Sequence, residues 1–181
     1  MPERTRQNLV LIGFMGSGKS TIGRLVARRM GFQFLDTDQL IVDRVGMAIP
    51  DLFALRGETA FRALETSVLE SLAHLNRCVI ATGGGAVVRE QNRATLRQLG
   101  FVVGLTASEA VLFERVSRNS KRPLLQGGDP LATVQEMLAR RAPFYADAAQ
   151  WTIDTSTLSH EQAVTAIIAE ARRAFAWQRV A

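Results

Sequence analysis

The sequence predicts an α/β fold in which a parallel sheet of five strands lies between two layers of helices. Short apolar segments with strand character recur five times, and amphipathic segments with helical period lie between them. A glycine-rich turn joins the first strand to the first helix. Strands that alternate with helices form parallel sheets whose ligands bind at the carboxyl ends of the strands.

The expected elements follow one another along the chain. The predicted strands are NLVLIGF (8–14), FQFLD (32–36), CVIAT (78–82), FVVGLT (101–106) and WTID (151–154). Helical periodicity predicts helices over 21–30, 93–99, 108–116 and 131–142. The patterns T106-A-S-E109 and S159-H-E-Q162 match the capping box, which predicts helix starts after the fourth and fifth strands.

Two insertions interrupt this alternation. Residues 38–76 hold three helical pieces, QLIVDRVG, PDLFALRG and ETAFRALETSVLESLAHL, which are more than one crossover requires. We expect a small helical substrate-binding subdomain there. Residues 117–129 are polar, basic and glycine-rich, and they suit either a mobile lid over an anion site or a dispensable surface loop.

Composition restricts the class of protein. A chain of 181 residues supports one well-buried core, so we expect a single domain over 1–181. No apolar run is long enough to span a bilayer and no signal-type segment is present, which predicts a cytoplasmic protein without a membrane partner. The net charge of +5 comes from scattered arginines, with only one Tyr and two Trp for stacking, so small anions fit better than nucleic acid. We expect a monomer.

The segment G13-F-M-G-S-G18-K19-S20 fits the phosphate-binding pattern G-x-x-x-x-G-K-[ST] between a strand and a helix. Its backbone N–H groups would enclose phosphates, with Lys19 at the β- and γ-phosphates and Ser20 on Mg²⁺. The alternative is a glycine-rich turn without a ligand. The nucleotide-binding residues expected from the motif are Gly16, Ser17, Gly18, Lys19, Ser20 and Thr21.

Two aspartates, Asp36 and Asp38, end the second predicted strand. In an extended segment their side chains share one face about 6 to 7 Å apart, so a cation or a proton would have to offset their repulsion. The alternative is a turn in which one aspartate caps the next helix and the other is solvated. The phosphate-binding pattern favours a site in which both carboxylates face a bound magnesium nucleotide.

The sequence resembles the shikimate kinase family. The nucleotide loop, L35-D-T-D38, F61-R62, G83-G-G85, R122-P-L-L125 and R140-R-A-P-F-Y145 occur in the family's order and rough spacing, from about residue 8 to 170. This resemblance implies a three-layer α/β/α P-loop kinase fold with a lid. It also implies ATP-dependent phosphorylation of the 3-hydroxyl of shikimate, in aromatic amino acid biosynthesis, with Mg²⁺ as the metal.

The resemblance also implies roles for the acceptor side of the site. Arg62 and Arg141 match the arginines that bind the shikimate carboxylate. Asp38 matches the residue that hydrogen-bonds the ring hydroxyls and takes the proton of the attacking one. Glu65 is expected to orient Arg62. Three glycines are expected to contact shikimate near the γ-phosphate: Gly83, Gly84 and Gly85.

On the nucleotide side, Asp36 matches an outer-shell magnesium position that acts through water. Arg122 matches the lid arginine that closes over the transferring phosphate, and Arg115 matches a residue that packs on adenine. The expected catalytic residues are Lys19, Asp38 and Arg122. His160 matches nothing in the pattern and is expected to be solvated. Two other functions stay open: a kinase of gluconate or of a nucleoside monophosphate, and a nucleotide-binding switch without turnover.

Overall fold

A computed structural model describes residues 7–118 and 129–177, and its described part contains one parallel sheet of five strands in the order β2-β3-β1-β4-β5. The predicted strands are confirmed with boundaries that move by at most a residue. They are β1 (Leu9–Gly13), β2 (Gln33–Asp36), β3 (Cys78–Ala81), β4 (Phe101–Thr106) and β5 (Trp151–Asp154).

The central strand β1 is buried along its whole length and pairs with β3 on one side and β4 on the other. Leu9 lies opposite Val79 and Phe101 in these two ladders. A strand covered on both faces has no polar face, which explains why LVLIG is apolar throughout instead of alternating.

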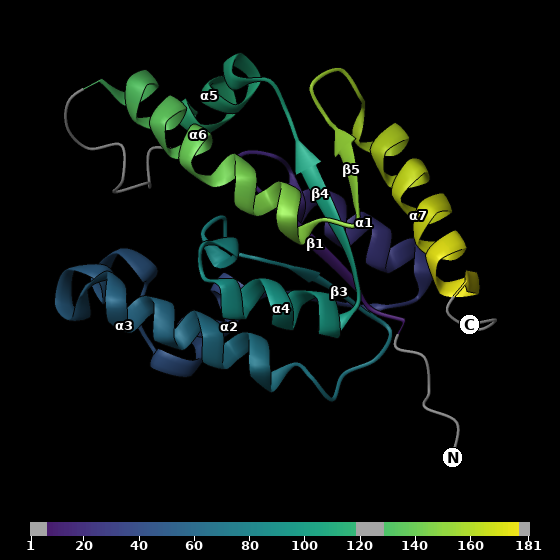
Figure 1. Ribbon diagram of the computed structural model, residues 1–181, viewed down its shortest axis with the longest axis horizontal. Helices are drawn as coiled ribbons and strands as arrows, with labels where there is room; N and C mark the ends of the chain where they lie inside the picture. Colours follow the sequence, from purple (N-terminus) through teal and green to yellow (C-terminus); the bar gives the residue numbers. More distant parts are fainter. Residues whose placement is uncertain (1–6, 119–128, 178–181) are drawn as a thin grey trace.

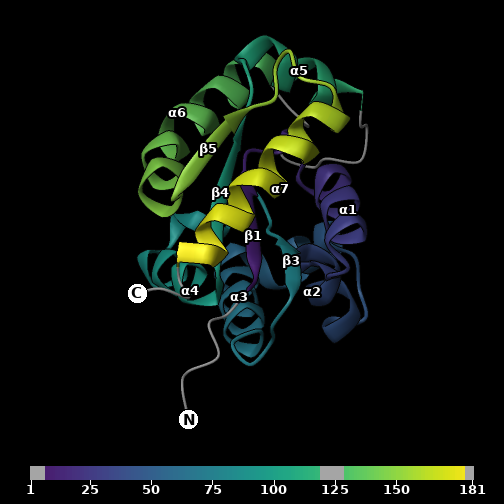
Figure 2. The same ribbon diagram turned by 90° about the vertical axis from the view of Figure 1, so that its right-hand side faces the viewer.

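Helices cover both faces of the sheet (Figure 1). On one face α1 and α7 pack against β1 and β4, and Figure 2 shows α7 crossing this face beside α1. On the other face α3, α4 and α6 form a second core layer. The helices are α1 (Lys19–Met30), α2 (Thr37–Val45), α3 (Ile49–Ser71), α4 (Glu90–Leu99), α5 (Glu109–Ser117), α6 (Pro130–Ala148) and α7 (His160–Trp177), with a 3-10 turn η1 (Ala86–Val88).

The insertion over 38–76 is helical, as predicted, and consists of α2 and α3. The second and third predicted pieces form one element, α3, interrupted at Gly57, whose φ of 75° is left-handed. Ile41, Leu52, Phe61 and Val68 are buried together between α2 and α3. The insertion therefore has an apolar core of its own beside the sheet.

One of the two predicted capping boxes is wrong. Thr106 is the last residue of β4, and Ser108 caps α5 instead by accepting from the Val111 N–H at 3.4 Å. At α7 the predicted box is confirmed, because Gln162 N–H donates to Ser159 Oγ and Ser159 N–H donates to Gln162 Oε1. Both segments match the capping-box sequence pattern equally well. Thr106, however, pairs with Asp154 in the ladder between β4 and β5, which keeps it in the strand.

The C-terminal end of α7 belongs to the core. Phe175 is buried and its ring lies 6.3 Å from that of Phe32. None of the helices over 7–118 and 129–177 is long and apolar enough to cross a membrane. The expected lid over 117–129 falls largely outside the described residues, and Arg122 lies there as well.

Candidate active site

The phosphate-binding pattern forms a tight loop between β1 and α1. Gly16 and Gly18 have positive φ values of 82° and 96°, and Gly18 is the N-cap of α1. An L side chain rarely adopts these conformations, so the glycines are required by the path of the chain. The loop turns back on itself through a hydrogen bond from Ser17 N–H to Phe14 O.

Lys19 is nearly buried inside this loop. Its Nζ donates to the carbonyl oxygens of Gly13 at 2.8 Å and Phe14 at 2.9 Å. Ser17 Oγ is one of two buried side-chain oxygens without a hydrogen-bond partner among the described residues. A cation held against a loop of backbone N–H groups is the arrangement that binds phosphate.

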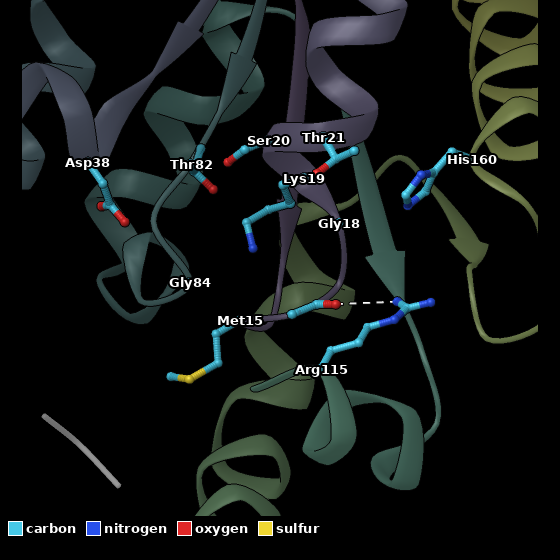
Figure 3. Close-up of a pocket in the computed structure, with 11 residues that line it drawn as sticks. Met15, Gly18, Lys19, Ser20, Thr21, Asp38, Thr82, Gly84, Arg115 and His160 are labelled. Atoms are coloured by element: carbon cyan, nitrogen blue, oxygen red, sulfur yellow. Dashed lines mark hydrogen bonds between the residues drawn. The ribbon is translucent and has the colours of Figure 1, made fainter. Parts of the chain in front are cut away.

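A cavity of about 550 Å³ opens beside the loop (Figure 3). It combines side chains from α1, α2, α5 and α7 with the end of β3. Most of the predicted nucleotide residues line it, whereas Ser17 is buried in the loop itself. The lining residues are Met15, Gly16, Gly18, Lys19, Ser20, Thr21, Asp38, Thr82, Gly84, Arg115 and His160.

The two aspartates are not a pair on one strand face. Asp36 is the N-cap of α2 and accepts from the N–H groups of Asp38 at 3.1 Å and Gln39 at 3.5 Å, so the capping alternative is correct for Asp36. Asp38 lies in the first helical turn, half-buried, and lines the cavity instead of pointing into bulk solvent. The helix start separates the two carboxylates and gives each a different environment.

A magnesium ion fits the oxygen atoms beside Lys19. The Ser20 hydroxyl, which lines the cavity, donates to Asp36 Oδ2 at 2.7 Å, so a hydroxyl and a carboxylate lie together beside the phosphate loop. Over 7–118 and 129–177 there is no group of three His, Cys, Asp or Glu side chains that could hold a metal. Mg²⁺ commonly keeps waters and substrate phosphates as ligands and needs few protein groups, which suits this pair.

Arg115 ties the loop to the end of β5. Its guanidinium donates to Gly16 O at 3.3 Å (Figure 3) and to Thr155 O at 3.1 Å. Thr155 is buried and also donates to Thr106 O. The structure therefore brings Arg115 and the loop after β5 to the same side of the cavity.

Arg62 and Arg141 line a second cavity, of about 240 Å³, between α3 and α6. Phe53 is part of its wall, whereas Phe61 is buried and packs on Phe53 with ring centroids 4.6 Å apart. The cavity combines cationic and apolar groups, which suits an anionic ligand with a hydrocarbon body. Its lining residues are Phe53, Glu58, Arg62, Val88, Met137, Arg140, Arg141 and Phe144.

The turn Gly83–Gly85 after β3 leaves space for these side chains. A Cβ atom built on Gly83 would lie 2.5 Å from Asp38 Oδ1, and one built on Gly85 would lie 2.6 Å from Arg62 Nη2. A Cβ on Gly84 would meet nothing closer than 3.4 Å, but Arg141 Nη1 would be within 3.9 Å of it. The turn thus brings Asp38, Arg62 and Arg141 together.

Glu65 is buried at 1% exposure behind Arg62. Its Oε2 accepts from Arg62 Nη1 at 3.0 Å, as the predicted orienting role requires, and its Oε1 has no hydrogen-bond partner. Burial raises the pKa of Glu65 above its usual 4.5, although Arg62 favours the charged form. The site therefore holds a carboxyl group that gains a proton more readily than a solvated one.

Three residues near the site, Tyr145, Glu58 and His160, were given no role in the site by the sequence. Tyr145 donates its hydroxyl to Gly84 O at 2.5 Å, and burial raises its pKa to about 12. Glu58 binds Arg62, and His160, although exposed, lines the larger cavity. Helical spacing of four residues from Arg141 and Arg62 is the signal that identifies Tyr145 and Glu58. No comparable signal marks His160.

Comparison with known proteins agrees with this geometry. The family model described as shikimate kinase matches residues 15–172. A shikimate kinase of Thermodesulfovibrio yellowstonii is 42% identical over 92% of this chain and 96% of its own, and one of Geobacter metallireducens is 45% identical over 89% of both. The structure of a shikimate kinase from Acinetobacter baumannii in complex with shikimate superposes with a TM-score of 0.88, at 37% identity, over 94% of this chain and 95% of that one. The chain belongs to the shikimate kinase family.

Proposed function

We propose that this protein transfers the γ-phosphoryl group of ATP to the 3-hydroxyl of shikimate. The observation that carries the proposal is the turn at residues 83–85, because it adjoins both cavities. Asp38 and Gly84 line the phosphate side, and Arg62 and Arg141 line the carboxylate side. A small acid with ring hydroxyls could bind with its carboxylate at the two arginines and a hydroxyl at Asp38.

Arg62 and Arg141 bind the carboxylate of shikimate in this proposal. Guanidinium groups pair with carboxylates through parallel hydrogen bonds, and the low exposure of Arg62 strengthens such bonds. The rings and methylene groups of Phe53 and Met137 would pack on the hydrocarbon ring. The main chain of Gly83, Gly84 and Gly85 can approach the substrate because no side chain intervenes.

Asp38 takes the proton of the attacking hydroxyl. It lines the same cavity as Lys19, so the hydroxyl that it activates would lie next to the phosphate cradle. Lys19 neutralises charge on the β- and γ-phosphate oxygens, and backbone N–H groups from Gly16 to Thr21 hold the phosphates. Arg115 packs on adenine, and Arg122 supplies a further cation over the transferring group.

Ser20 and Asp36 would hold Mg²⁺, Ser20 directly and Asp36 through water. Mg²⁺, when bound, would neutralise phosphate charge during transfer. Asp36 keeps the Ser20 side chain oriented through the hydrogen bond between them. The same carboxylate holds the first turn of α2 and so the place of Asp38.

Further proposals concern the domain organisation, the oligomeric state and the cellular location. Residues 1–181 form a single P-loop kinase domain, with 38–76 as the substrate-binding subdomain and 117–129 as the lid. The protein acts as a cytoplasmic monomer in aromatic amino acid biosynthesis, without a nucleic-acid or membrane partner. The scattered placement of its arginines argues against a nucleic-acid partner, and the lack of a long apolar run in the sequence argues against a membrane-spanning segment.

A coupled ADP-release assay tests the function with shikimate, gluconate and nucleoside monophosphates in parallel. We expect turnover with shikimate alone, and equal rates with gluconate would reject the substrate. Asp38→Asn should lower kcat by about 10²- to 10⁴-fold while ADP affinity is kept. Asp43→Asn is the matched control, because Asp43 lies on the same helix and contacts only the exposed Gln39 side chain in the described hydrogen bonds.

A further inference from the structure

Glu58 binds the guanidinium that the proposed function assigns to the substrate. Its Oε1 accepts from Arg62 Nε at 3.2 Å and from Arg62 Nη2 at 3.1 Å. Arg62 Nη1 donates to Glu65 at 3.0 Å. The side-on edge of the guanidinium, formed by Nε and Nη2, is therefore occupied by a carboxylate of the protein itself.

The end-on edge of Arg62 is also restricted. A Cβ on Gly85 would lie 2.6 Å from Nη2 and 2.7 Å from Cζ, which shows that the turn lies directly against the guanidinium. Glu65 is fully buried behind Arg62 and cannot leave without opening the core. Glu58 is the partner that can leave, because its side chain is 67% exposed.

The charges around the small cavity also limit what can enter. Among the described residues, Glu58 is the one carboxylate in the lining of this cavity, beside the guanidiniums of Arg62, Arg140 and Arg141. A substrate carboxylate that binds Arg62 while Glu58 stays would lie next to a second negative charge, and like charges at one site repel each other. Departure of Glu58 into water removes this repulsion.

We propose that Glu58 occupies on Arg62 the place of the substrate carboxylate and is displaced by it. Glu58 is thus an internal competitor that keeps Arg62 in its binding rotamer before substrate arrives. It makes the site selective for acids, because only an anion can replace the charge that Glu58 withdraws. This inference rests on the proposed function, since it takes Arg62 as the carboxylate ligand.

The test compares Glu58→Gln with the wild type in the coupled assay, with shikimate and its uncharged methyl ester as substrates. Exposed pairs of this kind are weak, so Glu58→Gln should lower the KM for shikimate by about two- to fivefold and change kcat less. The KM for the ester should stay the same, because the ester has no charge to exchange for that of Glu58. Glu70→Gln is the control: it removes an exposed glutamate from the same helix, at a contact with Gln91, and should change neither KM.

An unchanged or raised KM for shikimate in Glu58→Gln would overturn the inference, and so would an equal gain for the ester. Titration calorimetry of shikimate without nucleotide checks the same change as a binding affinity. Failure of the proposed function gives a different result, because the wild type would then not turn over shikimate at all.

Discussion

Gly85→Ala should weaken substrate binding because the added methyl group displaces the Arg62 side chain. Gly85 has a φ of −99° and a ψ of 0°, which alanine adopts without strain, so the backbone itself tolerates the change. The added Cβ would lie 2.6 Å from Arg62 Nη2 and 2.7 Å from Cζ. Arg62 Nη1 would lie closer still, and ordinary contact begins at 3.4 Å, so the guanidinium must move by about 1 Å.

Arg62 cannot move that far and keep its geometry. Its guanidinium is held by the buried Glu65 on one edge, and by Glu58 on another until the substrate displaces Glu58. A displacement of this size breaks the alignment of a bidentate carboxylate contact. Loss of one charge-assisted hydrogen bond is worth about 1.5 to 3 kcal/mol, which corresponds to a KM for shikimate raised roughly 10- to 150-fold.

The control is a substitution away from both cavities. The Asp43 side chain contacts only the exposed Gln39 in the described hydrogen bonds, so Asp43→Asn should change the KM for shikimate by less than about twofold. Both variants are assayed by ADP release at saturating ATP, with KM for ATP and the melting temperature as checks on folding. Equal KM values for shikimate in the two variants would refute the assignment of Arg62 to the substrate carboxylate.

Two further predictions concern stability. Burial raises the pKa of Glu65 above 4.5, so the folded protein binds the proton of this carboxyl group more tightly than the unfolded chain does. The resulting contribution to the free energy of unfolding is fully present below pH 4.5 and is lost as the pH rises through the folded-state pKa. Urea unfolding above pH 4.5 should therefore show a steeper loss of stability with pH in the wild type than in Glu65→Gln, and parallel curves would contradict the reasoning. Tyr145→Phe should lower the free energy of unfolding by about 0.5 to 1.5 kcal/mol, because the Gly84 carbonyl loses its 2.5 Å hydrogen bond. An unchanged urea midpoint would show that this bond is not needed.

Periodicity predicted most of the fold, and tertiary context decided the rest. The five strands are short apolar runs with turns at both ends, and burial on both faces leaves few other structures open to them. Helix starts were harder to predict, because a capping box is a short sequence pattern that does not show whether its first residue is paired in a strand. Thr106 fits the pattern as well as Ser159 does, but only Ser159 lies outside a ladder.

The phosphate loop was predictable because its glycines and Lys19 act through local backbone geometry. The acceptor side was not predictable by spacing alone, since Arg62, Gly85 and Arg141 come from three elements and meet only in the folded chain. Their roles came from the family resemblance. Glu58 shows the limit of both approaches, because an exposed glutamate four residues before an arginine is usually a surface pair of little value.

Asp36 explains why the pair of aspartates admitted two interpretations. In this chain α2 follows β2 without a loop, so Asp36 is both the last residue of the strand and the N-cap of the helix. In this protein Asp36 therefore satisfies N–H groups of α2 and accepts from Ser20 at the same time. The capping bond fixes the first turn of α2 and so sets the position of Asp38 beside Gly83. Helix capping and the contact with Ser20 both require a carboxylate at residue 36, so the sequence pattern alone cannot tell one role from the other.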